Sequence, residues 1–269
     1  MEKGLKENVL SRLKVVDIIL EVIDSRVPLT GRIPNLGEFK GKERILVFSK
    51  IDLSDPDVTR RWKRYYEDKG YRVALVNIKD GKGIDELKGI IKDVAEKMRK
   101  KLKDRRVMVL GIPNVGKSSL INSIIHRRKA RVGNEPGITK GIQWIKIGEN
   151  LYILDTPGIL HRNLNPKSED YKKLCLVGSI IPRALPIDEV VKYLFDFLRG
   201  NYPDVLKRKY GYDGDDFSEF VDHISRMKKH IKKGGEYDRV RTLRMILDDS
   251  TNGRIGNISY DLLKGNDRV

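Results

Sequence analysis

The sequence predicts an α/β fold, a three-layer sandwich of helices around a central sheet, followed by a smaller and mostly helical domain. The first 160 residues alternate strand-like apolar runs with helical patterns. After Gly158 the strand patterns fade, and helical periodicity continues to about residue 250. Alternation of strand and helix is typical of a sheet that helices cover on both faces. We therefore expect an α/β domain over residues 1–165 and a helical domain over residues 166–269.

Three apolar runs and two helices define the first half of the α/β domain. Strands are expected at residues 15–24, 44–49 and 72–77. Asp55-Pro56 opens a helix, because aspartate caps a helix N-terminus and proline suits the first helical position. This helix stops at Gly70. A second helix begins near Ile84, with apolar residues every three or four positions up to Leu102.

The second half of this domain continues the alternation. Further strands are expected at residues 107–111, 142–147 and 151–155. A helix over residues 120–125 follows the first of them, and the last two can pair across the short turn at residues 148–150. In the helical domain, apolar residues from Ile187 to Leu198 mark an amphipathic helix.

The composition favours a partner that carries many negative charges. Lys and Arg number 55 against 38 Asp and Glu, which gives a net charge of +17 over 269 residues. A surface rich in Lys and Glu, as in thermophilic proteins, would explain many charges but not their imbalance. A nucleic acid is therefore expected ahead of a membrane surface.

The chain also excludes several protein classes. Its single cysteine, Cys175, rules out disulfides within the chain and a zinc site built from cysteines, and it is expected in the core. No run approaches the roughly 20 apolar residues of a membrane-spanning helix. The first residues lack the apolar block of a secretory signal. We expect a cytoplasmic monomer with no membrane partner.

A phosphate-binding loop occupies residues 111–118. Its sequence GIPNVGKS matches G-x-x-x-x-G-K-[ST] and lies between a predicted strand and a predicted helix. Backbone N–H groups of such a loop surround phosphate, aided by the positive helix end. Lys117 is expected to contact the β- and γ-phosphates, and Ser118 to bind Mg²⁺. The other loop residues expected at the nucleotide are Asn114, Val115, Gly116 and Ser119.

Two later segments supply candidates for magnesium and γ-phosphate contacts. Asp155 of the DTPG segment follows a predicted strand and would hold Mg²⁺ through water, while the Gly158 N–H would contact the γ-phosphate. These four residues are also common turn formers, so a simple turn is the alternative. Thr139 is the only threonine from residue 127 to residue 150, which makes it the candidate Mg²⁺ and γ-phosphate ligand of a switch loop.

A base-reading loop precedes the phosphate loop. Ser49-Lys50-Ile51-Asp52 follows a buried strand, and the Asp52 carboxylate can accept two hydrogen bonds from guanine that adenine cannot donate. The aliphatic stem of Lys50 can lie over the base. Asn77-Ile78-Lys79 follows the next strand and would cup the base from another side. The predicted ligand is therefore GTP or GDP.

These segments occur in an unusual order. Relative to an ordinary GTP-binding domain, the fourth and fifth elements come before the first, second and third. A linker over residues 97–106 would join the ends of the ordinary fold. The chain thus resembles the circularly permuted P-loop GTPases, specifically the YlqF/RbgA-like ribosome-assembly GTPases. Further segments that resemble this family lie at residues 24–28, 136–144, 154–160, 176–180, 201–211 and 253–261.

The resemblance implies a protein that binds GTP with Mg²⁺, hydrolyses it slowly, and acts in maturation of the large ribosomal subunit in contact with ribosomal RNA. Three departures stand out. Ser49 replaces the usual asparagine and so removes an amide that ties the base loop to the phosphate loop. Asn77-Ile78 replaces a commoner Ser-Ala. The family's N-terminal segment with its histidine has no match in residues 1–10, so no catalytic histidine is carried over.

Hydrolysis needs a group that orients water, and the usual glutamine is replaced by Ile159. Three candidates remain. Asn114 could bind K⁺ beside the phosphates, His161 could move in when the switch closes, or the ribosome could supply the group. For His161 a solvated loop residue is the alternative. We favour K⁺ together with the ribosome.

Positive charge is concentrated in two segments. Residues 223–244 hold eight Lys or Arg against two acids, with Tyr237 available for stacking, and the linker over residues 97–106 is a second cluster. Solvated helix faces are the alternative. Since DTPG leads directly into the helical domain, we expect the GTP and GDP forms to differ in RNA binding. Other interpretations are an RNA-binding scaffold with little turnover, and a GTPase that acts on tRNA.

Overall fold

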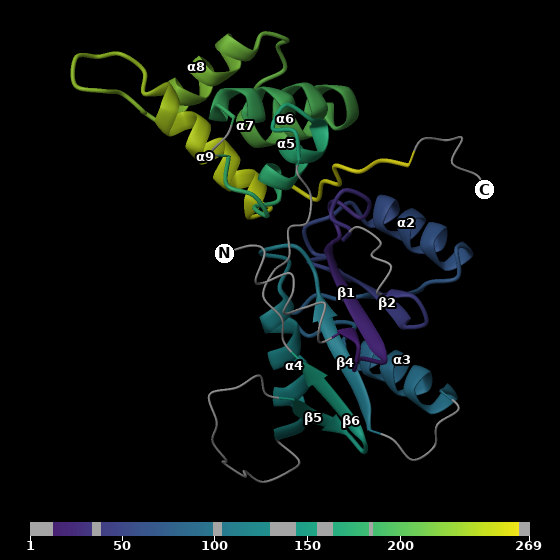
Figure 1. Ribbon diagram of the computed structural model, residues 1–269. Coiled ribbons are helices and arrows are strands. Elements are labelled where there is room, and N and C mark those ends of the chain that lie inside the picture. The colour runs from purple at the N-terminus through teal and green to yellow at the C-terminus, as the bar shows by residue number, and fades with distance from the viewer. Residues whose placement is uncertain are drawn as a thin grey trace. The chain divides into compact units, whose positions relative to one another are not determined.

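The computed structural model describes residues 13–33, 39–98, 104–129, 144–154, 164–182 and 185–263. They divide into two compact units, which are described separately (Figure 1). The α/β unit consists of Met1–Asp52, Pro56–Arg162 and Asp261–Val269, and the helical unit of Leu53–Asp55 and Asn163–Tyr260.

A single six-stranded sheet forms the centre of the α/β unit, in the order β3-β2-β1-β4-β6-β5. Its strands are β1 (Ile18–Asp24), β2 (Glu43–Ser49), β3 (Arg72–Leu75), β4 (Arg105–Leu110), β5 (Ile145–Gly148) and β6 (Leu151–Leu154). Neighbouring strands run parallel except β5 and β6, which form the predicted antiparallel hairpin. The first strand begins at Ile18 rather than residue 15, and Val15 is exposed.

Three helices cover this sheet: α2 (Pro56–Asp68), α3 (Ile84–Lys97) and α4 (Lys117–Lys129). Trp62 of α2 packs against Ile23 and Phe48 of the sheet. The residues next to these along their strands, Val22 and Val47, are fully buried as well. Because successive strand residues point to opposite faces, both faces of the sheet are covered. The predicted three-layer α/β fold is therefore confirmed.

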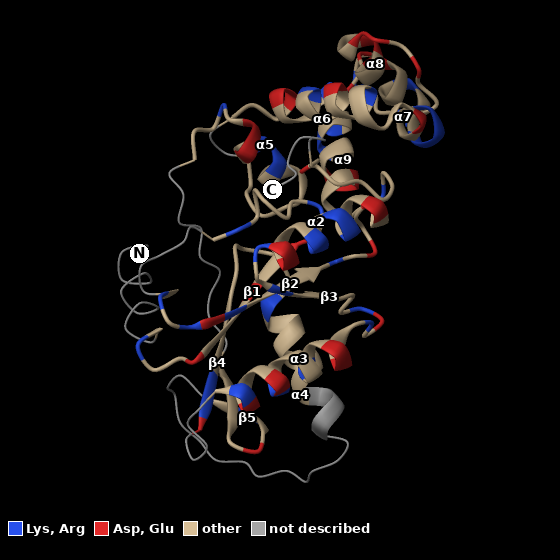
Figure 2. Cartoon of the chain, turned by 90° about the vertical axis from the view of Figure 1, so that its right-hand side faces the viewer, with Lys and Arg blue, Asp and Glu red and all other residues tan. Residues whose placement is uncertain are grey.

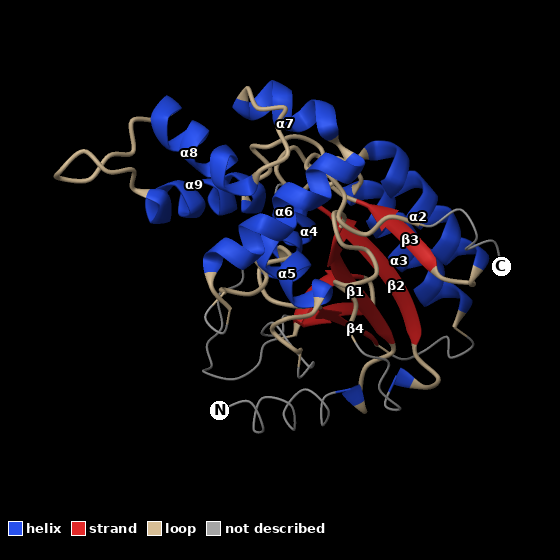
Figure 3. Ribbon diagram, turned by 90° about the horizontal axis from the view of Figure 1, so that it is seen from above, coloured by secondary structure: helices blue, strands red, loops and turns tan. Residues whose placement is uncertain are grey.

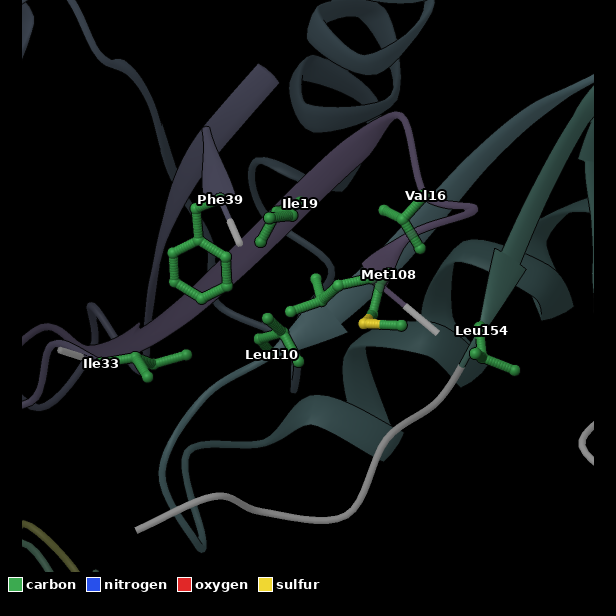
Figure 4. Close-up of a cluster of buried hydrophobic side chains, with 8 residues drawn as sticks. Val16, Ile19, Ile33, Phe39, Met108, Leu110 and Leu154 are labelled. Carbon is green, nitrogen blue, oxygen red and sulfur yellow. The ribbon is translucent and has the colours of Figure 1, made fainter. Parts of the chain in front are cut away.

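Apolar packing continues across the β1–β4–β6 side of the sheet. One buried cluster, shown in Figure 4, joins side chains from these strands and the segments before and after β1. Its members are Leu13, Val16, Ile19, Ile33, Phe39, Met108, Leu110 and Leu154. Close packing of this cluster holds β4 against β1. Because the phosphate loop begins directly after β4, the same packing positions the start of that loop.

The chain order of the strands places a binding crevice at one edge of the sheet. After β1 the chain adds β2 and β3 on one side, whereas after β4 it adds β5 and β6 on the other. Ligands of open α/β sheets bind outside the carboxyl ends of the strands at such a point. The crevice between the ends of β1 and β4 is therefore where a ligand is expected. Of the predicted linker over residues 97–106, only its two ends belong to the described part of the chain.

The helical unit contains α5 (Glu169–Leu176), α6 (Ile187–Asn201), α7 (Pro203–Tyr210), α8 (Phe217–Met227) and α9 (Arg239–Thr251), seen in blue in Figure 3. Phe195 and Phe220 meet in its core, with ring centroids 4.8 Å apart. Cys175 is buried and unpaired as predicted, and burial raises the pKa of its thiol to about 12. No helix in the described ranges is long and apolar enough to cross a membrane.

Two short segments belong to units that their place in the sequence does not suggest. Leu53–Asp55 follows the base loop but lies in the helical unit, where the Leu53 carbonyl accepts from Ile258 N at 3.1 Å. Asp261 lies in the α/β unit, where its carboxylate accepts from the backbone N–H and hydroxyl of Thr30 at 2.7 and 2.8 Å. The expected boundary between residues 165 and 166 places neither Leu53–Asp55 nor Asp261 in the unit to which it belongs.

Candidate nucleotide-binding site

The phosphate loop links the end of β4 to the start of α4. Asn114 and Gly116 have left-handed backbone angles, with φ of 62° and 95°, and these turn the loop back on itself. A Cβ atom at Gly111 would lie 2.5 Å from the Val22 carbonyl oxygen, so only glycine fits where the loop passes β1. Helix α4 then begins at Lys117, which places its N-terminal N–H groups at the loop.

Lys117 is 6% exposed and its ammonium donates to the Ile112 carbonyl at 2.8 Å. A buried ammonium inside a loop of backbone N–H groups provides the positive charge that phosphate requires. Asn114, Ser118 and Ser119 are exposed on the same loop and helix turn. The loop therefore has the donors and the charge to hold a polyphosphate.

Ser49 joins the base loop to the phosphate loop. It is fully buried, and its hydroxyl lies 2.8 Å from the Val115 carbonyl and 3.1 Å from the Ile23 carbonyl. A hydroxyl has one proton, and the shorter distance favours donation to Val115. Serine lacks the amide that usually ties the two loops, as expected, but a connection is present. The hydroxyl makes the connection because the Val115 carbonyl comes within its reach.

Lys50 is held at both its backbone and its side chain. Its φ is 57°, unusual for a residue other than glycine. Its ammonium lies 2.9 Å from the Asp24 carboxylate at the end of β1. The Ser25 hydroxyl donates to the Lys50 carbonyl at 3.0 Å. Contacts within the protein therefore hold Lys50 at its carbonyl and at its ammonium.

Asn77 orders the second base-reading loop, which consists of residues 77–79. Its side-chain amide donates to the Asp80 carboxylate at 2.9 Å, and its side-chain carbonyl accepts from Lys79 N at 3.1 Å. A Cβ atom at Gly116 would lie 3.1 Å from Cδ1 of Ile78, so Ile78 lies over the phosphate loop. Asn77-Ile78 thus fills the place of the commoner Ser-Ala with a contact of its own.

Asp52 and Lys79 come together more loosely. Their charged groups are 3.7 Å apart, and the Lys79 side chain is 76% exposed, so this ion pair contributes little to stability. Together with the Ser49–Val115 and Ile78–Gly116 contacts, it brings the three predicted loops to one edge of the sheet. The structure therefore places the base-reading candidates beside the phosphate loop, as the permuted order of segments requires.

Four predicted site residues, Thr139, Asp155, Gly158 and His161, lie outside the described residues. Within the described ranges, no group of three or more His, Cys, Asp or Glu side chains could hold a metal ion. Ser118, which the structure describes, occupies the Ser/Thr position after Lys117 in the phosphate-loop motif, and the hydroxyl at this position binds Mg²⁺ in such loops.

The site contains residues that the sequence argument did not assign. Asp24 ends β1, and Ser25 and Arg26 follow it. These three residues contact the base loop or one another, whereas the sequence suggested them only through the resemblance of residues 24–28. An acidic residue at the last position of a buried strand, at the carboxyl edge of the sheet, was the available indication.

Comparison with known proteins agrees with this site. Residues 106–203, which include the phosphate loop, match the family described as 50S ribosome-binding GTPase. The chain is 34% identical to the ribosome biogenesis GTPase A of Priestia megaterium, covering 95% of this chain and 92% of that protein. It is 32% identical to the ribosome biogenesis GTPase A of Thermotoga maritima, covering 95% of this chain and 90% of that protein.

Two solved structures share the fold. GNP-bound YlqF from T. maritima superposes with a TM-score of 0.69 at 28% identity, covering 96% of this chain and 98% of that chain. A GDP-bound structure of YlqF superposes with a TM-score of 0.66 at 30% identity, covering 95% of this chain and 98% of that chain. The similarity thus extends over both units of the chain.

Proposed function

The chain belongs to the ribosome biogenesis GTPase A family, and from this premise we propose its ligands, its reaction partner and the roles of its residues. It is a GTP-binding protein and a GTPase of ribosome assembly. We propose that it hydrolyses GTP to GDP slowly on its own and faster on the large ribosomal subunit, acting as a cytoplasmic monomer. The observation that carries the nucleotide-binding part of this proposal is the 2.8 Å contact from Ser49 to Val115, which joins a base-reading loop to a phosphate loop.

The nucleotide would be held at both ends. Asp52 would accept hydrogen bonds from guanine, Lys50 would cover the base with its stem, and Asn77-Ile78-Lys79 would close the base site. Lys117 would contact the phosphates together with the backbone N–H groups of Val115 and Gly116. The discrimination against adenine follows from the carboxylate of Asp52, which adenine would leave without its donors.

Magnesium and potassium would neutralise charge that develops on the phosphates during hydrolysis. Ser118 would be the magnesium ligand from the described residues, joined by Asp155 and Thr139. Asn114 would bind K⁺, since it is exposed on the phosphate loop and carries an amide oxygen. Gly158 and His161 remain candidates for the γ-phosphate contact and for orienting water.

Potassium dependence has a direct test. Turnover of GTP measured in NaCl should be severalfold slower than in KCl, and Asn114→Ala should make the two rates equal. Equal rates for the unchanged protein would contradict the potassium role while leaving the GTPase assignment intact.

The α8–α9 hairpin, defined as residues 228–238, supports an RNA partner. It projects from the helices of its unit in Figure 1, and a bridge pairs Ile231 with Tyr237. Lysines are exposed on it at positions 228, 229, 232 and 233, and none forms an ion pair with the described part of the chain. The Arg226 guanidinium donates to the Tyr237 hydroxyl at 3.0 Å, which holds the ring where a base could stack.

A phosphate-binding role for this hairpin predicts a steep loss of affinity with salt. Each phosphate contact to single-stranded RNA adds about 0.7 to the slope of log affinity against log salt. Replacing Lys232 and Lys233 by alanine should lower that slope for ribosomal RNA. Replacing Lys192, which is already paired with Asp196 at 2.7 Å, should leave the slope unchanged. Equal slopes for all three proteins would contradict the hairpin's role.

The partner is tested by GTP turnover in KCl with purified large or small ribosomal subunits. Stimulation by large subunits alone supports the proposal. Tight GTP binding without stimulation by either subunit would instead support an RNA-binding scaffold. Stimulation by tRNA and not by subunits would indicate a GTPase that acts on another RNA. In each case the nucleotide affinity of the protein is measured separately.

A further inference from the structure

We infer that Asp24 is a positioning residue for guanine recognition, because its buried carboxylate fixes the side chain of Lys50 in the base site. The inference rests on the proposed role of Lys50 at the base. Asp24 itself lies at the end of β1 and is fully buried, so it acts through Lys50.

The carboxylate of Asp24 has four polar partners. Oδ1 accepts from Arg26 N at 3.1 Å and from Arg26 Nε at 2.9 Å. Oδ2 accepts from Arg26 Nη2 at 2.8 Å and lies 2.9 Å from Lys50 Nζ. A bidentate arginine on one side fixes the plane of the carboxylate, which leaves one defined position for the lysine ammonium.

Ser25 adds two contacts to the same loop. Its backbone N–H donates to the Ser49 carbonyl at 2.9 Å, and its hydroxyl donates to the Lys50 carbonyl at 3.0 Å. Lys50 is therefore held at its carbonyl and at its ammonium, while its backbone keeps a φ of 57°. A left-handed conformation at a residue other than glycine persists when the surroundings determine it, and such positions occur at ligand sites.

The charges and the exposure of this cluster indicate which cation on Asp24 lies within reach of a nucleotide. Burial alone would raise the pKa of Asp24, but the attraction of Arg26 and Lys50 outweighs it and holds that pKa below its ordinary value. Arg26 is 1% exposed and is enclosed with the carboxylate, whereas the Lys50 side chain is 25% exposed. Of the two cations on Asp24, Lys50 is the one that a nucleotide can reach.

A purely structural role for Asp24 is the competing explanation, and Glu21 provides the matched control. Glu21 is an equally buried acid on the same strand, paired with Arg32 at 2.9 Å and Arg44 at 2.6 Å. These partners belong to none of the three nucleotide loops. Glu21→Gln therefore removes a buried charge of the same kind without disturbing Lys50.

The experiment is a double-mutant cycle on the full chain, with the dissociation constant of GDP measured by calorimetry. Asp24→Asn keeps the shape of the side chain but turns an N–H donor toward a cation. Lys50→Met keeps the stem and removes the ammonium. Each single variant should weaken GDP binding about tenfold, the size of one charged hydrogen bond. The double variant should also be about tenfold weaker, since both changes break one contact.

Two further measurements separate positioning from folding. Inorganic tripolyphosphate, which needs only the phosphate loop, should bind Asp24→Asn and the unchanged protein equally. If Asp24→Asn does not fold, Ser25→Ala takes its place. It removes one hydroxyl contact to Lys50 and should weaken GDP binding severalfold with unchanged tripolyphosphate binding.

The outcomes distinguish this inference from the proposed function. Absence of GDP binding by the unchanged protein would overturn the proposed function and the inference with it. The inference alone would be overturned if Asp24→Asn leaves GDP binding intact. It would also be overturned if Asp24→Asn weakens GDP binding by the same factor in the unchanged protein and in Lys50→Met. Loss of GDP affinity in Glu21→Gln as large as in Asp24→Asn would also overturn it.

Discussion

Removing the hydroxyl of Ser49 should weaken nucleotide binding without preventing folding. The hydroxyl is fully buried and lies 2.8 Å from the Val115 carbonyl, so Ser49→Ala removes the hydrogen bond between the two loops. Removing one partner of a hydrogen bond, so that a buried carbonyl is left without its donor, costs about 1–3 kcal/mol. We expect the free energy of unfolding to fall by about 2 kcal/mol.

The effect on binding follows from the same contact. GDP needs the base loop and the phosphate loop at a fixed separation, and a loosened connection must be ordered again on binding. If ordering the two loops again costs about 1 kcal/mol of the free energy of GDP binding, the dissociation constant rises about fivefold. Thermal unfolding with and without GDP, together with calorimetric titration, measures both quantities.

Ser225→Ala is the matched control for this prediction. Ser225 is fully buried and its hydroxyl donates to the Val221 carbonyl at 2.8 Å, but it lies in α8 of the helical unit. It should lower stability by a similar amount and leave GDP affinity unchanged. The reasoning is refuted if Ser49→Ala binds GDP as tightly as the unchanged protein, or if the two variants lose GDP affinity equally.

Three other perturbations have expected outcomes. Lys117→Met should abolish measurable GTP binding while thermal unfolding stays cooperative, because its ammonium sits inside the phosphate loop beside the Ile112 carbonyl; retained binding would contradict this. Asp261→Ala removes three hydrogen bonds, two of them from Thr30, and should lower the free energy of unfolding by about 3 kcal/mol in urea titrations. Burial lowers the pKa of His230 below 6.5, and repulsion from a nearby guanidinium lowers it further. As the pH falls, the unfolded chain therefore protonates this histidine before the folded protein does. The free energy of unfolding should fall as the pH drops below 6.5. Denaturation at several pH values should show this loss in the unchanged protein and less of it in His230→Gln.

Much of the fold was predictable because its causes are local. The phosphate loop at residues 111–118 is identified by its glycines and by the predicted strand and helix on either side. The predicted helix that opens at Asp55-Pro56 is α2, and the apolar run at residues 44–49 is β2. Period and cap residues are set by neighbours a few positions away, so a sequence records them directly.

The basic character of the protein was visible in the same way, but its placement was not. Figure 2 shows lysine and arginine spread over helices and loops of both units. The sequence singled out residues 223–244, and the structure adds that residues 228–238 form a hairpin anchored by His230, whose Nδ1 lies 2.9 Å from the Thr242 hydroxyl. Anchoring of this kind depends on two helices meeting, which charge counting cannot show.

Other features depended entirely on tertiary structure. The sequence showed that Ser49 lacks the usual amide, but not that its hydroxyl connects the two loops. This connection exists because Val115, 66 positions away, presents a carbonyl 2.8 Å from the hydroxyl. Leu53–Asp55 belongs to the helical unit through residues some 200 positions later, and Asp261 returns to the α/β unit.

The sequence by itself determined the class of fold, the permuted order of the loops and the residue types that a guanine nucleotide requires. Only the tertiary structure decided which side chains hold those loops together, above all Asp24 on Lys50 at 2.9 Å. The physical reason is range. Helices, strands and turns follow from contacts between near neighbours, whereas the alignment of a binding site depends on hydrogen bonds whose partners meet only after the sheet has formed.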